Sequence, residues 1–212
     1  MNTKHNSFAS AKEPQLSLFP DPVKETSEPL PDTVHQYFFI ISPPDAVKSK
    51  VKSLKHKLNT AVGLSDHNLH SVPHISLMSF HTMWPVNDRF MQVVQQLFSA
   101  IHCFEVKLHG YEHFVHGSSS DTIYVKLSDS DKIKLMYQEL HNLLGLRVRS
   151  FVPHLAIAHT IPRANFGKSF SIVKKHSFDE EFVCETVTLL ERKLQHGVAG
   201  KYRVLKEIKL AA

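Results

Sequence analysis

Apolar and polar positions repeat with two different periods along the chain, and these periods predict a mixture of strands and helices. Apolar runs rich in aromatic and β-branched residues predict buried strands at 36–41, 72–78, 104–108, 123–127 and 151–158. Apolar residues spaced by three and four predict amphipathic helices at 47–62, 87–100 and 130–144. A further short stretch, helical or looped, covers 164–175, and two long alternating segments predict adjacent antiparallel strands at 182–194 and 202–210.

Residues 1–33 differ in composition from everything that follows. They contain five prolines among Ser, Thr, Glu and Lys, and they carry three lysines against five acidic residues. Such a segment buries too little apolar surface to offset the entropy of the chain. We therefore expect a disordered tail over 1–33 and one folded domain over 34–212.

Composition limits the class of protein. The chain has 212 residues, of which 42% are hydrophobic, enough for one sizeable domain or two small lobes. It contains no apolar run of about 18 residues and no secretory leader pattern, so we expect a cytoplasmic protein. Cys103 and Cys184 lie far apart and fit neither a disulfide framework nor a zinc site. The net charge of +5, carried by the part after the acidic tail, favours a phosphate-bearing ligand.

One hexapeptide occurs twice, as VPHISL at 72–77 and as VPHLAI at 152–157. Each copy follows a predicted strand and helix, which indicates two related halves. Side chains alternate along a strand, so His74 and Ser76 face one side while Ile75 faces the core. If a pseudo-twofold axis relates the halves, His74 and His154 converge on one groove. A lone strand histidine is most often structural, whereas the repetition favours a function.

At these residues the sequence resembles the two-histidine (2H) phosphoesterase superfamily, in the branch of 2′-5′ RNA ligases and RNA 2′,3′-cyclic phosphodiesterases. That family carries two His-x-Thr/Ser motifs on strands about half a domain apart. The resemblance covers residues 35–210, including Gly200-Lys201-Tyr202 before the last strand. It implies an α+β, bilobal fold of two pseudo-symmetric halves, with antiparallel sheets flanked by helices around a central cleft. It implies no metal and no other cofactor.

The resemblance also implies roles for the site residues. Opening a cyclic phosphodiester requires one group that accepts a proton and one that donates a proton, and imidazole titrates near neutral pH. We assign His154 as the base and His74 as the acid for hydrolysis, although the residues do not decide between the two orders or between hydrolysis and ligation. Ser76 donates to a phosphoryl oxygen. Ala156 occupies the place of the second Thr or Ser and has no hydroxyl to donate. The candidates to supply the missing hydrogen bond are Arg149, His159, Thr160 or a backbone N–H.

Several other residues are weaker candidates. Phe80, Tyr124 and Phe151 are of the type that stacks on a base, or they belong to the core. Arg149 is a candidate for substrate binding. His109, His113 and His116 have the spacing of a metal site on a helix, but their surroundings predict a strand, and no metal is expected.

The tail contains a separate motif, Gln15-Leu16-Ser17-Leu18-Phe19. It is similar to the peptide with which bacterial replication and repair proteins dock on the DNA sliding clamp. Exposed Leu18 and Phe19 in a flexible segment suit a hydrophobic groove of a partner, and the alternative is a short apolar cluster that packs on this protein's own body or has no role. Three hypotheses therefore stay open: a phosphodiesterase or ligase acting on RNA ends or nucleotides, a phosphate- or RNA-binding module of the same fold, and a protein tethered to the clamp.

Overall fold

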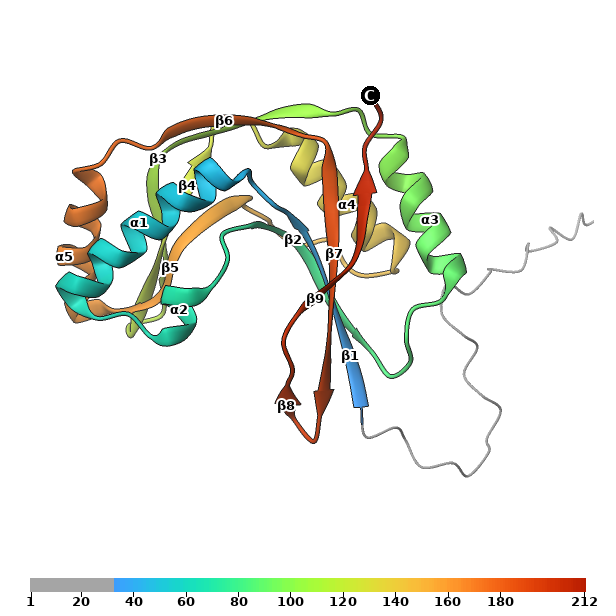
Figure 1. The fold of residues 1–212 in the computed structure, drawn as a ribbon, viewed down its shortest axis with the longest axis horizontal. Helices are drawn as coiled ribbons and strands as arrows, with labels where there is room; N and C mark the ends of the chain where they lie inside the picture. Colours follow the sequence, from blue (N-terminus) through green and yellow to red (C-terminus); the bar gives the residue numbers. More distant parts are fainter. Residues whose placement is uncertain (1–32) are drawn as a thin grey trace, which may run out of the picture.

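The computed structural model describes residues 33–212, which form nine strands and five helices (Figure 1). The strands are β1 (Thr33–Ile41), β2 (Ile75–Thr82), β3 (Phe104–His116), β4 (Ser120–Leu127), β5 (His154–Pro162), β6 (Asp179–Cys184), β7 (Thr186–Gln195), β8 (Val198–Ala199) and β9 (Arg203–Lys209). The helices are α1 (Asp45–Val62), α2 (Asp66–His70), α3 (Asp88–Ser99), α4 (Asp131–Leu143) and α5 (Arg163–Lys174).

All strand pairs are antiparallel, and the sheet has two halves. One half has the order β2-β1-β7, with β8 and β9 both paired to β7, and the other has the order β5-β4-β3-β6. In each half the strand of the repeated hexapeptide is the inner edge. The halves meet where Ile75 of β2 pairs with Leu155 of β5, so hydrogen bonding continues from one half to the other. This arrangement confirms the predicted α+β fold with an antiparallel sheet flanked by helices.

The helices are exchanged between the halves. α1 follows β1 but packs against α5 and β5, and α4 follows β4 but packs against β2. In Figure 1, α1 and α5 accordingly lie on the side of β3, β4 and β5, whereas α3 lies along β9. The exchange is reciprocal, as expected for halves related by a pseudo-twofold axis.

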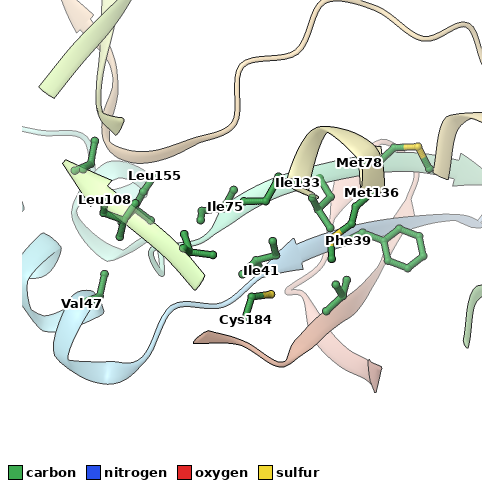
Figure 2. Close-up of a cluster of buried hydrophobic side chains, with 14 of the residues drawn as sticks. Phe39, Ile41, Val47, Ile75, Met78, Leu108, Ile133, Met136, Leu155 and Cys184 are labelled. Carbon is green, nitrogen blue, oxygen red and sulfur yellow. The ribbon is translucent and has the colours of Figure 1, made fainter. Parts of the chain in front are cut away.

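A shared hydrophobic core results from this exchange. Its buried side chains come from both halves, and Figure 2 shows Ile41 and Ile75 of one half near Leu108 and Leu155 of the other. Val47 on α1 and Met136 on α4 pack into the same cluster. Because the core crosses the junction, neither half buries its apolar face alone.

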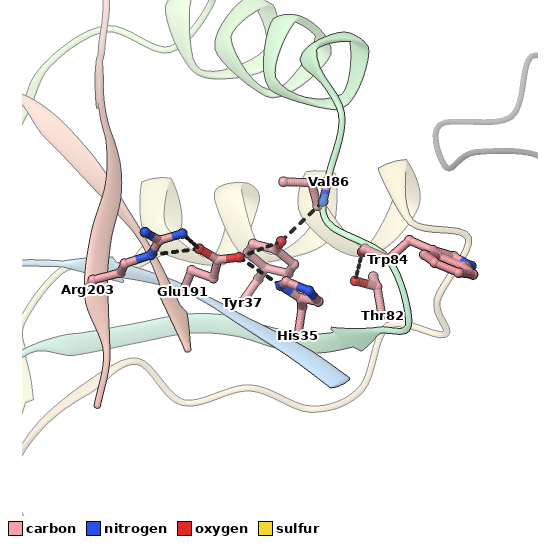
Figure 3. A network of polar contacts seen from close by, with 7 residues as sticks. All are labelled: His35, Tyr37, Thr82, Trp84, Val86, Glu191 and Arg203. Carbon is pink, nitrogen blue, oxygen red and sulfur yellow. Dashed lines mark hydrogen bonds and ion pairs between the residues drawn. The ribbon is translucent and has the colours of Figure 1, made fainter. Parts of the chain in front are cut away.

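A buried polar network holds β1, β7, β9 and the segment before α3 together (Figure 3). Glu191 accepts hydrogen bonds from His35 Nδ1 at 2.9 Å, the Tyr37 hydroxyl at 3.0 Å, and Arg203 Nε and Nη2 at 2.9 and 2.5 Å. The Tyr37 hydroxyl in turn accepts from the Val86 N–H at 3.1 Å. Burial alone would raise the pKa of Glu191, but the donors from Arg203, His35 and Tyr37 lower it below its usual value.

The structure confirms most of the predicted elements and corrects two. The segment 182–194 is not one strand, because it divides at Glu185 into β6, which pairs with β3, and β7, which pairs with β1 and β9. The strand predicted at 104–108 continues to His116, past Gly110, which has a φ of 69°. Helix α2 was not predicted, since its five residues are too few to show a helical period.

Within residues 33–212, none of the helices combines the length and the hydropathy of a membrane-spanning segment. The motif at 15–19 lies outside the described residues.

Candidate active site

His74 immediately precedes β2 and His154 is the first residue of β5, the two strands that meet at the junction, and both side chains lie on the same face of the sheet. Ile75 and Leu155 are directly paired and fully buried, so the histidine that precedes each of them points to the opposite face from the core. Position by position, residues 71–78 and residues 151–158 have the same order of exposed, half-buried and buried side chains. In both, the histidine is half-buried and the aliphatic residue that follows is buried. The two motifs therefore match in burial as well as in sequence pattern.

Each histidine is held by the same hydrogen bond. His74 Nδ1 lies 2.9 Å from the carbonyl oxygen of Val72, and His154 Nδ1 lies 2.9 Å from that of Val152. A carbonyl only accepts, so Nδ1 carries the proton in both rings. Nε2 is then the atom of each imidazole that can exchange a proton with a ligand.

Aromatic rings from β1, β3 and β4 contact the two imidazoles. The ring of Phe38 on β1 is perpendicular to that of His74, with ring centroids 5.2 Å apart. Phe114 and Tyr124, which stack on each other at 4.3 Å, lie 4.9 and 5.2 Å from His154. Fixed ring orientation is what proton transfer in a defined direction requires.

The electrostatic surroundings favour neutral imidazoles. Burial lowers the pKa of His154, and it lowers the pKa of His74, which the positive charges of Lys55 and His154 lower further. Lys55, on α1, is 2% exposed, and burial lowers its own pKa to about 8. The charge of Lys55 therefore favours the form of His74 that acts as a base, which weighs against our assignment of His74 as the acid unless an anion offsets Lys55.

His159 is a third histidine at this site, five residues after His154. The residue as a whole is exposed, but partial burial of its imidazole, with the charges of His154, Lys55 and His74, lowers the pKa of His159 to about 4. The side chain of Asn68 on α2 fixes its backbone, since Nδ2 donates to the His159 carbonyl and Oδ1 accepts from the His159 N–H, both at 2.7 Å. Thr160, the next residue, has a φ of 49°, which is unfavourable for a β-branched side chain.

Lys55 and Asn68 were not predicted as part of the site. Lys55 is one of many lysines on an amphipathic helix, and Asn68 sits in a helix of five residues. No local pattern in the sequence indicates that either side chain reaches the motif strands.

The candidates for substrate binding have different positions. Phe80 is 8% exposed and packs on Tyr37 in the core, so the core alternative describes it better than stacking on a base. Tyr124 and Phe151 both line a hollow of about 230 Å³ beside the second motif. Phe151 stacks on Tyr137 with centroids 4.2 Å apart. Arg149 is exposed, and its backbone N–H lies 3.4 Å from the Tyr137 hydroxyl.

The histidines at 109, 113 and 116 have three separate environments. His109 faces Asp179 at 3.4 Å, His113 packs on Phe166, and His116 lies 2.9 Å from the Thr122 hydroxyl. Among residues 33–212, no group of three or more His, Cys, Asp or Glu side chains is arranged to hold a metal ion.

Comparison with known families identifies the chain. The model of the 2′-5′ RNA ligase superfamily matches residues 43–196, which is most of the sequence. The chain belongs to the 2′-5′ RNA ligase superfamily. A comparison with curated proteins gave no match.

Several solved structures have a fold similar to that of this chain. LigT of E. coli in its apo form is 15% identical with a TM-score of 0.58, and the match covers 84% of this chain and 99% of LigT. LigT complexed with 3′-AMP is 17% identical with a TM-score of 0.57 over 84% and 99% of the two chains. The protein TT0787 of Thermus thermophilus is 16% identical with a TM-score of 0.56 over 82% and 97%.

Within the 2′-5′ RNA ligase superfamily, this chain departs from the two-motif pattern at Ala156. Ser76 and Ala156 occupy equivalent half-buried positions two residues after each histidine. Ala156 pairs with Tyr124 on β4, whose hydroxyl donates to Glu112 Oε2 at 3.0 Å. Because that hydroxyl is already engaged, Tyr124 is not a free replacement for the missing donor.

Proposed function

We propose that this superfamily member is a phosphodiesterase or 2′-5′ RNA ligase-like enzyme. Its substrates are RNA ends or nucleotides with a 2′,3′-cyclic phosphate or a 2′-5′ linkage, and His74 and His154 are its acid and base. The observation that carries the proposal is the equivalence of the two motif histidines, with matching hydrogen bonds at 2.9 Å on one face of the sheet.

The proposed hydrolysis uses two proton transfers. Nε2 of one imidazole accepts a proton from a water molecule while the oxygen of that water attacks phosphorus. The bond from phosphorus to one ribose oxygen then breaks. The second histidine, protonated at Nε2, donates its proton to that departing oxygen. The Ser76 hydroxyl donates to a non-bridging oxygen on which charge develops. In ligation a ribose hydroxyl replaces water, and the same two transfers occur.

Both transfers are supplied by imidazoles, so we propose that the reaction requires no metal ion. Bound phosphate also favours the protonated form of a neighbouring histidine, which offsets the effect of burial on its pKa. LigT, which shares the fold, has been crystallised with 3′-AMP and with ATP, and this supports a nucleotide or RNA end as the ligand here.

The experiment that tests this proposal uses the purified full chain in excess EDTA. It is incubated with 2′,3′-cyclic nucleotides and with a short RNA that ends in a cyclic phosphate, and the phosphate isomer of the product is identified by chromatography. We expect turnover to a single isomer. Absence of product on every substrate would overturn the proposal.

Ala156 favours a second candidate function, a module that binds phosphate or RNA without processing it. Loss of one oxyanion donor typically reduces a rate by about 10²–10³-fold. This alternative expects saturable, salt-sensitive RNA binding without product, and stoichiometric hydrolysis would exclude it.

From sequence alone we also propose that residues 15–19 dock on the DNA sliding clamp. Leu18→Ala combined with Phe19→Ala should abolish binding to the purified clamp, measured by surface plasmon resonance, because these side chains are the apolar anchors. Binding of the double variant at wild-type strength would refute the proposal. Turnover should be unchanged in the variant.

A further inference from the structure

A pocket of about 580 Å³ adjoins the first motif. One wall is the part of α1 from Asp45 to His56, and the other is the segment 69–73, which ends in Pro73 next to His74. Its ionisable lining residues are Asp45, Lys48, Lys52, Lys55, His56 and His70. The pocket thus presents three lysines and two histidines against one carboxylate.

Lys55 lies at this pocket without a counterion. Its Nζ donates to the carbonyl and the hydroxyl of Ser71 at 2.8 and 2.6 Å, and the residue is 2% exposed. In the described part of the chain, no carboxylate lies within ion-pair distance of Lys55 or Lys52. The lining acid, Asp45, is exposed and faces Lys48 at 3.4 Å. A buried charge is costly unless an opposite charge compensates it, so the pocket favours an anion.

The equivalent place in the other half provides a comparison. The hollow of about 230 Å³ beside the second motif is lined by Val152, Pro153 and the start of α4, as the first is by Val72, Pro73 and the start of α1. There Lys126 faces Glu112 at 3.4 Å. A lysine of the second hollow is thus balanced by a carboxylate of the same hollow, whereas Lys55 and Lys52 of the first are not.

We propose that the first pocket binds a second phosphate group of the substrate, separate from the phosphate that lies between the histidines. The inference rests on the proposed function for the identity of the substrate. Pro73, which lines the pocket, directly precedes His74, so the pocket lies next to the first motif. The lowering of the pKa of His74 by the charge of Lys55, in addition to the larger effect of burial, agrees with this proximity.

Isothermal titration with pyrophosphate tests the pocket directly. Lys55→Met keeps the length of the side chain and removes the charge, and Lys52→Gln removes a charge at the exposed side. We expect each to weaken pyrophosphate binding about tenfold or more, as for loss of a hydrogen bond from a charged group. Lys57→Gln on another face of α1, where Nζ lies 3.1 Å from His176 Nε2, is the matched control and should bind as wild type.

The melting temperature separates binding from folding. Lys55→Met should melt near wild type, because the removal of an uncompensated buried charge offsets the loss of its two hydrogen bonds to Ser71. Pyrophosphate binding that is unchanged in Lys55→Met and Lys52→Gln but lost in His154→Ala would place the anion at the histidines and overturn the proposal.

Substrate length gives a second readout. We compare kcat/KM for a cyclic mononucleotide and for a trinucleotide with the same terminal cyclic phosphate. The preference for the trinucleotide should fall about tenfold in Lys55→Met, and an equal loss on both substrates would overturn the proposal. If the wild type turns over neither substrate, the proposed function fails, while the pyrophosphate titration still decides whether the pocket binds anions.

Discussion

Ile75 pairs with Leu155 across the junction of the two halves, and both side chains are fully buried. Each of these residues directly follows the histidine of its motif, so the pair fixes the relative position of His74 and His154. The exchanged helices α1 and α4 pack on the same strands from the core side. The geometry of the candidate site is therefore a direct consequence of how the core of one half joins that of the other.

Ala156→Thr should increase activity. The substitution places a hydroxyl at the position equivalent to Ser76, where it can donate to a phosphoryl oxygen. We expect kcat for a 2′,3′-cyclic nucleotide to rise about tenfold or more, with little change in KM. Steady-state kinetics measure this, and Ala156→Val is the control, since it adds nearly the same volume without a donor. A rise of the same size in Ala156→Val would show that packing and not the hydroxyl is responsible.

Asn68→Ala should release the end of β5. The variant loses both hydrogen bonds to the backbone of His159, each 2.7 Å long, and leaves strained Thr160 without its support. We expect a loss of about 2 kcal/mol in the free energy of unfolding. Hydrogen exchange at the His159 amide should accelerate well before global unfolding. Asn59→Ala, which removes a single cap bond at the end of α1, is the control and should leave this amide protected.

Glu191→Gln should destabilise the domain by about 3 kcal/mol at pH 7, because it leaves His35, Tyr37 and Arg203 around a neutral group. The control Glu207→Gln, on the exposed face of β9, should change the free energy of unfolding little. Urea unfolding measures both.

The same network predicts a dependence on pH. The pKa of Glu191 in the folded protein lies below its ordinary value of 4.5, so its contribution is complete above that value and is lost as the pH falls through the lowered pKa. The difference in stability between wild type and Glu191→Gln should therefore narrow below about pH 4. A difference that stays constant down to about pH 3 would contradict this assignment of the carboxylate.

The repeated motif and its two faces were predictable because both follow from local alternation. His74 and Ser76 differ from Ile75 in polarity, and that difference decides which side chain enters the core. The division of 182–194 at Glu185 was not predictable, since alternation indicates a strand but not its partner. The position of Lys55 beside His74 also depends on tertiary packing of α1, and a helical period contains no such information.

The most direct test of the central claim is the rate of hydrolysis of a 2′,3′-cyclic phosphate in EDTA by His74→Ala and His154→Ala. We predict that each variant loses about 10³-fold or more in kcat while its melting temperature stays near that of wild type. His109→Ala, an exposed histidine of β3, serves as the control and should retain full activity. Wild-type turnover in either motif variant would contradict the account of His74 and His154 as the acid and base.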